Sequence, residues 1–159
     1  MKNFANGTTL ASRFAFVNIE TAMIFHEVKV AAIALLQKRF GSLYDFNNTM
    51  ISATHTHSGP GGFTFFPLYD ITTLGYHQAS LEIVANGIFE AIAQAHGDIV
   101  RGATLRVVTD ALVKPMTNIN RSPWAYLFNP PQERAQYAYD VDKNFTLVRI
   151  DDANGLPIG

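Results

Sequence analysis

The sequence predicts an α/β fold in which a mixed sheet is flanked by helices. The 159 residues are 48% apolar and 16% charged, which is typical of a globular domain that buries about two thirds of its unfolded surface. Short apolar runs alternate along the chain with longer stretches of helical period. Predicted strands lie close to both ends of the chain, so we expect an excerpt of a larger domain.

The first elements are expected in the order strand, helix, strand. Residues 14–19 (FAFVNI) form a short apolar run. Apolar residues then recur in steps of 4, 3 and 4, at Ile24, Val28, Ala31 and Leu35. This period predicts a helix that ends near Phe40, before Gly41. Residues 49–54 return as a strand, and such a unit usually pairs its strands in parallel through a right-handed crossover.

The remaining sequence predicts one more helix and two more strands. A helix over about residues 75–96 is indicated by apolar residues in register, with Gly97 as a left-handed stop. These apolar residues are Leu81, Val84, Ile88, Ile92 and Ala95. Residues 103–108 alternate as a half-buried strand does, residues 114–131 form a long loop, and residues 145–150 form a final strand.

Composition narrows the possible partners. The net charge is -1 and no block of basic residues occurs, so binding to nucleic acid is not expected. The chain has no cysteine, so a metal ion would be held by histidine, carboxylate, tyrosine or water. We expect neither a signal peptide nor a membrane span, because residues 1–9 lack an apolar core and no run of about 18 uncharged apolar residues occurs.

The most informative stretch is residues 51–62 (ISATHTHSGPGG), an apolar strand that ends in two histidines and a glycine-rich loop. Alternate side chains of an extended chain share a face, so we expect His55 and His57 to lie together, about 6 to 7 Å apart at the backbone. Sheets of this class bind ligands at the carboxyl ends of parallel strands, and the glycines would leave room for one. Two imidazoles suit zinc, although a catalytic zinc takes three or more protein ligands. The alternative is a pair of hydrogen-bonded polar residues.

Arg121 is a second candidate, because it lies in the long loop near Pro123, Trp124 and Tyr126. A planar guanidinium suits an oxyanion or a hydroxyl-bearing head group, and the alternative is a solvated loop arginine. Surface, interface or helix-end positions explain the other histidines, His26, His77 and His96.

Four aromatic residues follow the glycine-rich loop, at Phe63, Phe65, Phe66 and Tyr69. Judged by themselves, these side chains are expected in the core. The alternative is that they line the mouth of an apolar channel.

Three groups of residues resemble the neutral ceramidase family. They are residues 54–63 (THTHSGPGGF), residues 120–123 (NRSP) followed by Tyr126, and residues 129–130 (NP) with residues 133–134 (ER). Their order and joint occurrence are more specific than the His-x-His pair alone, and the resemblance covers nearly all of the chain. It implies that residues 1–159 are part of that family's amino-terminal catalytic domain, incomplete at both ends.

The resemblance implies zinc-dependent hydrolysis of the amide bond of ceramide, which gives sphingosine and a fatty acid. By residue, it implies that His55 is a zinc ligand and that His57 and Arg121 are polar groups close to the reacting amide. The family's other zinc ligands and its serine implicated in attack are expected beyond Gly159, so the 159-residue chain alone is expected to be inactive. The resemblance also implies a secreted or membrane-associated parent protein, with ceramide as its lipid substrate and peripheral contact with membrane lipid.

Two other classes of function remain open. One is a different His-x-His hydrolase, of the amidohydrolase or metallo-β-lactamase kind; the latter normally has an acidic residue where this chain has Gly59. The other is a non-catalytic lipid-binding or structural module whose histidines are only hydrogen bonded. The glycine-rich loop argues against such a module, because its glycines are expected to accommodate a ligand.

Overall fold

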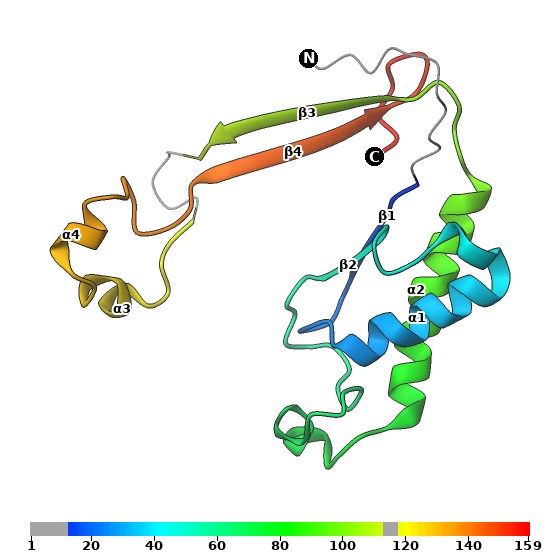
Figure 1. Cartoon of the computed structure of the whole chain (residues 1–159), viewed down its shortest axis with the longest axis horizontal. Coiled ribbons are helices and arrows are strands. Elements are labelled where there is room, and N and C mark those ends of the chain that lie inside the picture. The colour runs from blue at the N-terminus through cyan, green and yellow to red at the C-terminus, as the bar shows by residue number, and fades with distance from the viewer. Residues whose placement is uncertain (1–12, 113–117) are drawn as a thin grey trace. The chain divides into compact units, whose positions relative to one another are not determined.

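The computed structural model describes residues 13–112 and 118–159, and it confirms the α/β fold class. The chain divides into two compact units, Met1–Ile99 and Val100–Gly159, and each is described by itself. The first unit contains β1 (Ala15–Ile19), α1 (His26–Phe40), β2 (Thr49–Ala53) and α2 (Gln78–Gly97), with short 3-10 turns η1 (Gly41–Leu43), η2 (Pro67–Tyr69) and η3 (Ile71–Thr73). The second unit contains β3 (Thr104–Ala111), α3 (Pro123–Leu127), α4 (Pro131–Arg134) and β4 (Asn144–Asp151) (Figure 1).

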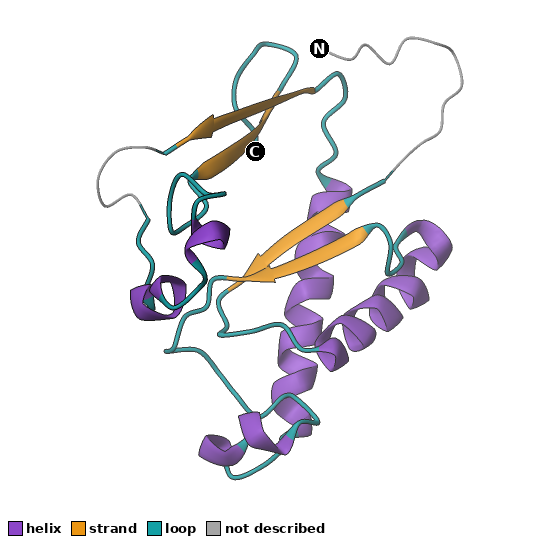
Figure 2. Ribbon diagram, turned by 60° about the vertical axis from the view of Figure 1, so that its left-hand side comes forward, coloured by secondary structure: helices purple, strands orange, loops and turns teal. Residues whose placement is uncertain are grey.

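In the first unit, β1 and β2 form a parallel pair, with Val17 opposite Ile51. Figure 2 shows the two strands running in the same direction beside the helices. The helices cover one face of this pair, because Val17 is buried in the core whereas Phe16 and Met50, on the other face, are more than half exposed. The predicted parallel pairing is confirmed.

The core of the first unit lies between α1, α2 and the covered face of β1. Its buried helical residues are Val28, Ala32, Ile33 and Leu36 from α1 and Leu81, Ala85, Ile88 and Ile92 from α2. The predicted core face of α1 is confirmed at Val28 and is wrong by about one position after it, since Ala31 and Leu35 are only half-buried. The helix begins after Phe25, so Ile24 lies outside it and could not help to fix the face.

The two long helices end differently. Gly41 follows α1 with a φ of 63°, a conformation that glycine adopts without steric cost, so the predicted end of this helix is confirmed. Gly97 was expected to be a left-handed stop for α2, and this is wrong. It lies within the helix, which ends where the Asp98 N–H donates to the Gln94 carbonyl.

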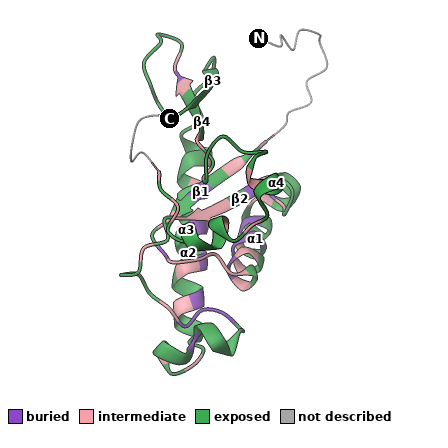
Figure 3. Ribbon diagram, turned by 90° about the vertical axis from the view of Figure 1, so that its left-hand side faces the viewer, coloured by how far each residue is buried: buried purple, intermediate pink, exposed green. Residues whose placement is uncertain are grey.

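In the second unit, β3 and β4 pair antiparallel along their whole length. We expected a half-buried β3, but every residue of it is exposed (Figure 3). Alternating polarity shows that one face of a strand is apolar enough to be buried. It does not show that another element packs against that face. The long loop expected over residues 114–131 is also wrong in part, because α3 lies within it. Residues 113–117 of that loop lie outside the described residues.

Within residues 13–112 and 118–159, no helix has both the length and the apolar character needed to cross a membrane.

Candidate functional site

The histidine loop, residues 54–62, leaves the carboxyl end of β2 beside the carboxyl end of β1. The Thr54 N–H donates to the Ile19 carbonyl at 3.1 Å, and the Thr54 hydroxyl donates to the Glu20 carboxylate at 2.9 Å. Both contacts fasten the loop to the end of the neighbouring strand. The loop therefore begins at the sheet edge where proteins of this class bind ligands.

His55 and His57 are brought together by the loop rather than by the strand. The ring centroids are 5.0 Å apart and the rings meet edge to face. We expected alternation along an extended strand to place them on one face, but β2 ends at Ala53 and His55 has a φ of 62°. The expected proximity is present, and its cause is a left-handed residue in the loop.

The backbone carbonyl of Ala22 fixes the orientation of the His55 ring. Nδ1 of His55 lies 2.6 Å from the Ala22 oxygen, and since a carbonyl only accepts hydrogen bonds, Nδ1 carries the proton. In a neutral ring the other nitrogen, Nε2, then has a free lone pair. A histidine that binds a metal through one nitrogen and donates to a carbonyl through the other is the usual arrangement in metal sites. His55 is therefore suited to act as a ligand.

The rest of a metal site is not formed by the described residues. Among residues 13–112 and 118–159, no group of three or more histidine, cysteine, aspartate or glutamate side chains is close enough to hold an ion. His57 lies beside His55, and Glu20 accepts a hydrogen bond from the neighbouring Thr54, without completing such a group. The donor set of this part of the chain fits one or two zinc ligands, and a catalytic zinc requires three.

The glycines of the histidine loop serve close packing within the chain. A Cβ at Gly59 would lie 2.9 Å from the backbone oxygen of Glu20, and a Cβ at Gly62 would lie 2.7 Å from Cδ2 of His77. Gly62 also has a φ of 77°. We expected these glycines to leave room for a ligand, and that interpretation is wrong because protein atoms occupy the space. They therefore supply no argument against a non-catalytic module.

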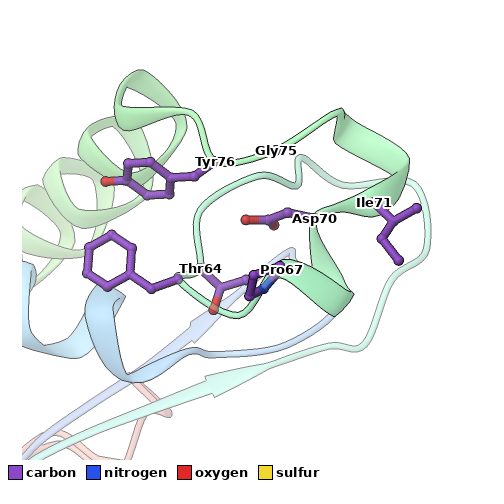
Figure 4. Close-up of a pocket in the computed structure, with 7 residues that line it drawn as sticks. Thr64, Pro67, Asp70, Ile71, Gly75 and Tyr76 are labelled. Atoms are coloured by element: carbon purple, nitrogen blue, oxygen red, sulfur yellow. The ribbon is translucent and has the colours of Figure 1, made fainter.

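The aromatic residues after the loop divide between core and surface. Phe63 is buried and meets the ring of Phe25 edge-on at 5.7 Å, as expected for a core residue. Phe65, Phe66 and Tyr69 are more than half exposed, so the expectation of core positions is wrong for them. Next to them lies a pocket of about 380 Å³ lined by Thr64, Phe65, Pro67, Asp70, Ile71, Gly75 and Tyr76 (Figure 4).

Two groups near the histidine loop were missed by sequence reasoning. One is the Ala22 carbonyl, which any residue could supply, so no signal in the sequence marks it. The other is Glu27, in the first turn of α1, which accepts a hydrogen bond from the Phe65 N–H at 2.8 Å. Its second carboxylate oxygen is buried without a hydrogen-bond partner in the part of the chain that is described.

Arg121 belongs to the second unit, where it precedes α3 and is exposed. The loop around it is ordered by Asn120, whose side chain accepts from the Ser122 N–H at 2.8 Å and donates to the Asp140 carbonyl at 3.3 Å. The Arg121 guanidinium is thus presented on a fixed loop.

The three histidines without an expected role have structural positions. His26 is exposed at the start of α1, and His77 precedes α2, with Nε2 at 2.7 Å from the Thr73 carbonyl. His96 lies in the last turn of α2, as expected, and Nδ1 also contacts the Tyr44 hydroxyl at 2.9 Å and the Arg13 guanidinium at 2.7 Å.

Comparison with known proteins identifies the family. The model described as neutral/alkaline non-lysosomal ceramidase, N-terminal, matches residues 4–159. Neutral ceramidase B of Dictyostelium discoideum is 46% identical over 147 residues, which are 92% of this chain and 20% of that protein. The neutral ceramidase of Oryza sativa subsp. japonica is 40% identical over 147 residues, which are 92% of this chain and 18% of that protein.

A solved structure is also similar. The crystal structure of neutral ceramidase from Pseudomonas aeruginosa matches with a TM-score of 0.77 and 33% sequence identity, over 89% of this chain and 22% of that one. The chain thus spans about a fifth of the length of the proteins it matches. The matched family model, the curated relatives and the shared fold agree: this chain belongs to the neutral/alkaline non-lysosomal ceramidase family.

Proposed function

We propose that the full-length protein containing this chain is a zinc-dependent amidase that hydrolyses ceramide to sphingosine and a fatty acid. The observation that carries the proposal is His55, whose Nδ1 is fixed by the Ala22 carbonyl beside a second imidazole at a sheet edge. The family membership and the names of the relatives supply the substrate class. We propose also that residues 1–159 form part of the catalytic domain.

His55 would hold the zinc through Nε2, the nitrogen left free by the hydrogen bond to Ala22. When bound, zinc would supply a Lewis acid for the amide carbonyl and lower the pKa of a water molecule. The remaining ligands would come from parts of the full-length protein outside the described residues, since these contain no group of three ligands.

His57 and Arg121 would act on the amide by donating hydrogen bonds. No hydrogen bond occupies the His57 ring within residues 13–112 and 118–159, and its edge-to-face contact with His55 holds it beside the proposed ligand. The exposed Arg121 guanidinium offers donors in a plane that suits an oxyanion or a sphingoid hydroxyl. Such donors stabilise the negative charge that develops on the carbonyl oxygen.

A lipid substrate also bears on where the protein works. Ceramide is met at a lipid surface, which supports a secreted or membrane-associated protein with peripheral membrane contact. The net charge of -1 without a basic block gives no support to nucleic acid as a partner.

The test is to replace His55 by alanine in the full-length protein, with His26→Ala as the matched control. His26 is an exposed histidine of the same unit. We expect His55→Ala to lose both zinc, measured by plasma mass spectrometry, and the release of fatty acid from a fluorescent ceramide. The control should retain both. Stoichiometric zinc in the His55→Ala variant would overturn the assignment.

A second variant separates the two histidines. We expect His57→Ala to retain zinc and to lose a factor on the order of 10²–10³ in kcat, as removal of an oxyanion donor does. A wild-type protein with zinc but without ceramide hydrolysis would favour a different His-x-His hydrolase. Absence of zinc from the full-length protein would favour the non-catalytic module.

A further inference from the structure

An exposed group of apolar side chains follows the histidine loop. We call it the apolar tip; it consists of Phe65, Phe66, Leu68, Tyr69, Ile71 and Leu74, each more than half exposed. Leu68 is 73% exposed and Leu74 is 95% exposed. Soluble surfaces tolerate single exposed apolar residues, but six within ten positions of one loop indicate a contact surface.

The apolar tip carries almost no exposed charge. Between Ser58 and Tyr76 the sequence has one charged residue, Asp70, which is only 3% exposed. In Figure 4 the Asp70 carboxylate lies inside the loop, among the residues that line the pocket, whereas the Ile71 side chain extends outward. The surface offered by the tip is therefore apolar and uncharged.

The backbone of the apolar tip is hydrogen bonded within the loop. In the turns η2 and η3, carbonyls of the same segment accept from the N–H groups of Tyr69, Asp70, Thr73, Leu74 and Gly75. The Asp70 carbonyl accepts at 2.9 Å from Gly75 and at 3.2 Å from Thr73. The Thr73 hydroxyl also donates to the Asp70 carbonyl at 3.0 Å. Such internal pairing lowers the cost of taking a loop out of water, because few polar backbone groups lose their partners.

The exposed apolar residues of the two-stranded sheets differ in this respect. Phe16 and Met50 lie on a two-stranded sheet, and β3 and β4 form another. The strands β1, β2 and β3 each have one edge without a strand partner among the described residues, so their backbone groups suit pairing with further protein. The apolar tip pairs five of its N–H groups within its own turns and therefore needs fewer hydrogen-bond partners from its surroundings.

We propose that the apolar tip enters the interfacial region of an uncharged lipid bilayer and holds the histidine loop at the membrane surface. The two segments are joined directly, since the His77 N–H donates to the Gly62 carbonyl at 2.7 Å. Phenylalanine, tyrosine and leucine are the side chains that favour this interface. This inference rests on the proposed function, because it names the lipid bilayer as a partner of the proposed ceramide site.

The charge of the apolar tip sets the lipid specificity. With no exposed lysine or arginine between Ser58 and Tyr76, binding gains nothing from anionic head groups. We therefore expect similar affinity for vesicles of phosphatidylcholine alone and for vesicles that also contain phosphatidylserine, with little dependence on salt.

The experiment measures co-sedimentation of the full-length protein with phosphatidylcholine vesicles that contain no ceramide. The test variant combines Leu68→Ser with Leu74→Asn, and the control is Ile83→Ser on α2. Ile83 is 73% exposed, as Leu68 is, and it lies in the same unit. We expect the test variant to lose at least roughly tenfold in vesicle affinity, from two apolar side chains that no longer leave water. The control should bind as the wild type does.

Each other outcome has a defined meaning. Equal binding by the wild type, the test variant and the control overturns the proposal, as does binding that requires phosphatidylserine. A lower thermal unfolding midpoint in the test variant alone would show that the tip packs against protein and would also overturn it. Because the vesicles lack ceramide, a tip that binds in a protein without amidase activity would refute the proposed function and leave this inference standing.

Discussion

Replacing Gly62 by alanine tests whether the histidine loop owes its glycines to close packing. Alanine at a φ of 77° costs about 1–2 kcal/mol, because its Cβ crowds the carbonyl oxygen. The new Cβ would also lie 2.7 Å from Cδ2 of His77, so the ring must move. Its movement breaks the 2.7 Å contact of Nε2 with the Thr73 carbonyl, at a cost of about 0.5–1.5 kcal/mol. His77 is exposed and free to move elsewhere, so we expect a total loss of about 1.5–3.5 kcal/mol, the sum of these two costs.

The assay is urea denaturation followed by circular dichroism, with Gly87→Ala as the control. Gly87 lies on the exposed side of α2, and a Cβ there would meet nothing within 4 Å. Alanine should therefore stabilise the helix by about 0.5–1 kcal/mol, which is the opposite sign. A Gly62→Ala protein within about 0.5 kcal/mol of the wild type would refute the packing argument, because that change is the size of an ordinary surface substitution.

Two further outcomes follow from single residues. Phe63→Ala should lower the free energy of unfolding by about 3–5 kcal/mol in urea denaturation, because it removes a buried ring. Phe66 is exposed, so Phe66→Ala should change the free energy of unfolding by less than about 0.5 kcal/mol. Equal effects of the two variants would contradict the division of the aromatic residues between core and surface. The pKa of the Asp152 carboxyl is held below its ordinary value, chiefly by the backbone N–H of Leu156. Because its pKa is lowered in the folded protein, the Asp152 carboxylate stabilises its turn at pH values above the ordinary pKa of aspartate. This stabilisation is lost as the pH falls through the lowered pKa. Titration by nuclear magnetic resonance should find the lowered pKa in the wild type, and an ordinary value would contradict the hydrogen bonding.

The sequence predicted those parts of the fold that depend on local periodicity. The order of β1, α1 and β2 and their parallel pairing follow from short apolar runs on either side of a helical period. Burial was predicted less well. Residues of β3 alternate in polarity, yet no element of the described second unit covers either face. A local sequence pattern indicates which residues of a segment could be buried. Whether they are buried depends on the elements that pack against the segment.

The candidate site shows the same division. His55 and His57 were recognised from residue type and spacing, because two imidazoles two positions apart can converge on one metal ion. The feature that suits His55 to bind a metal is its hydrogen bond to the Ala22 carbonyl, and a backbone oxygen leaves no trace in a sequence. The glycines were visible but misread, since a glycine that admits a ligand and one that admits the protein's own backbone look the same.

The histidine loop and the apolar tip each contain a residue with an unusual backbone conformation. His55 and Leu74 are the non-glycine residues with positive φ in the described chain, at 62° and 60°. A left-handed leucine costs about 1–2 kcal/mol, and Leu74, at 95% exposed, gains almost no burial in return. Burial within the described chain therefore does not offset this cost, and the proposed membrane contact would.

Asparagine adopts the left-handed conformation readily, so Leu74→Asn alone should stabilise the protein by about 0.5–1 kcal/mol while it weakens vesicle binding. Thermal unfolding and vesicle sedimentation on the same preparation measure both effects. A variant that is destabilised instead would mean that Leu74 packs within the folded protein, and the strained backbone would then require no membrane to explain it.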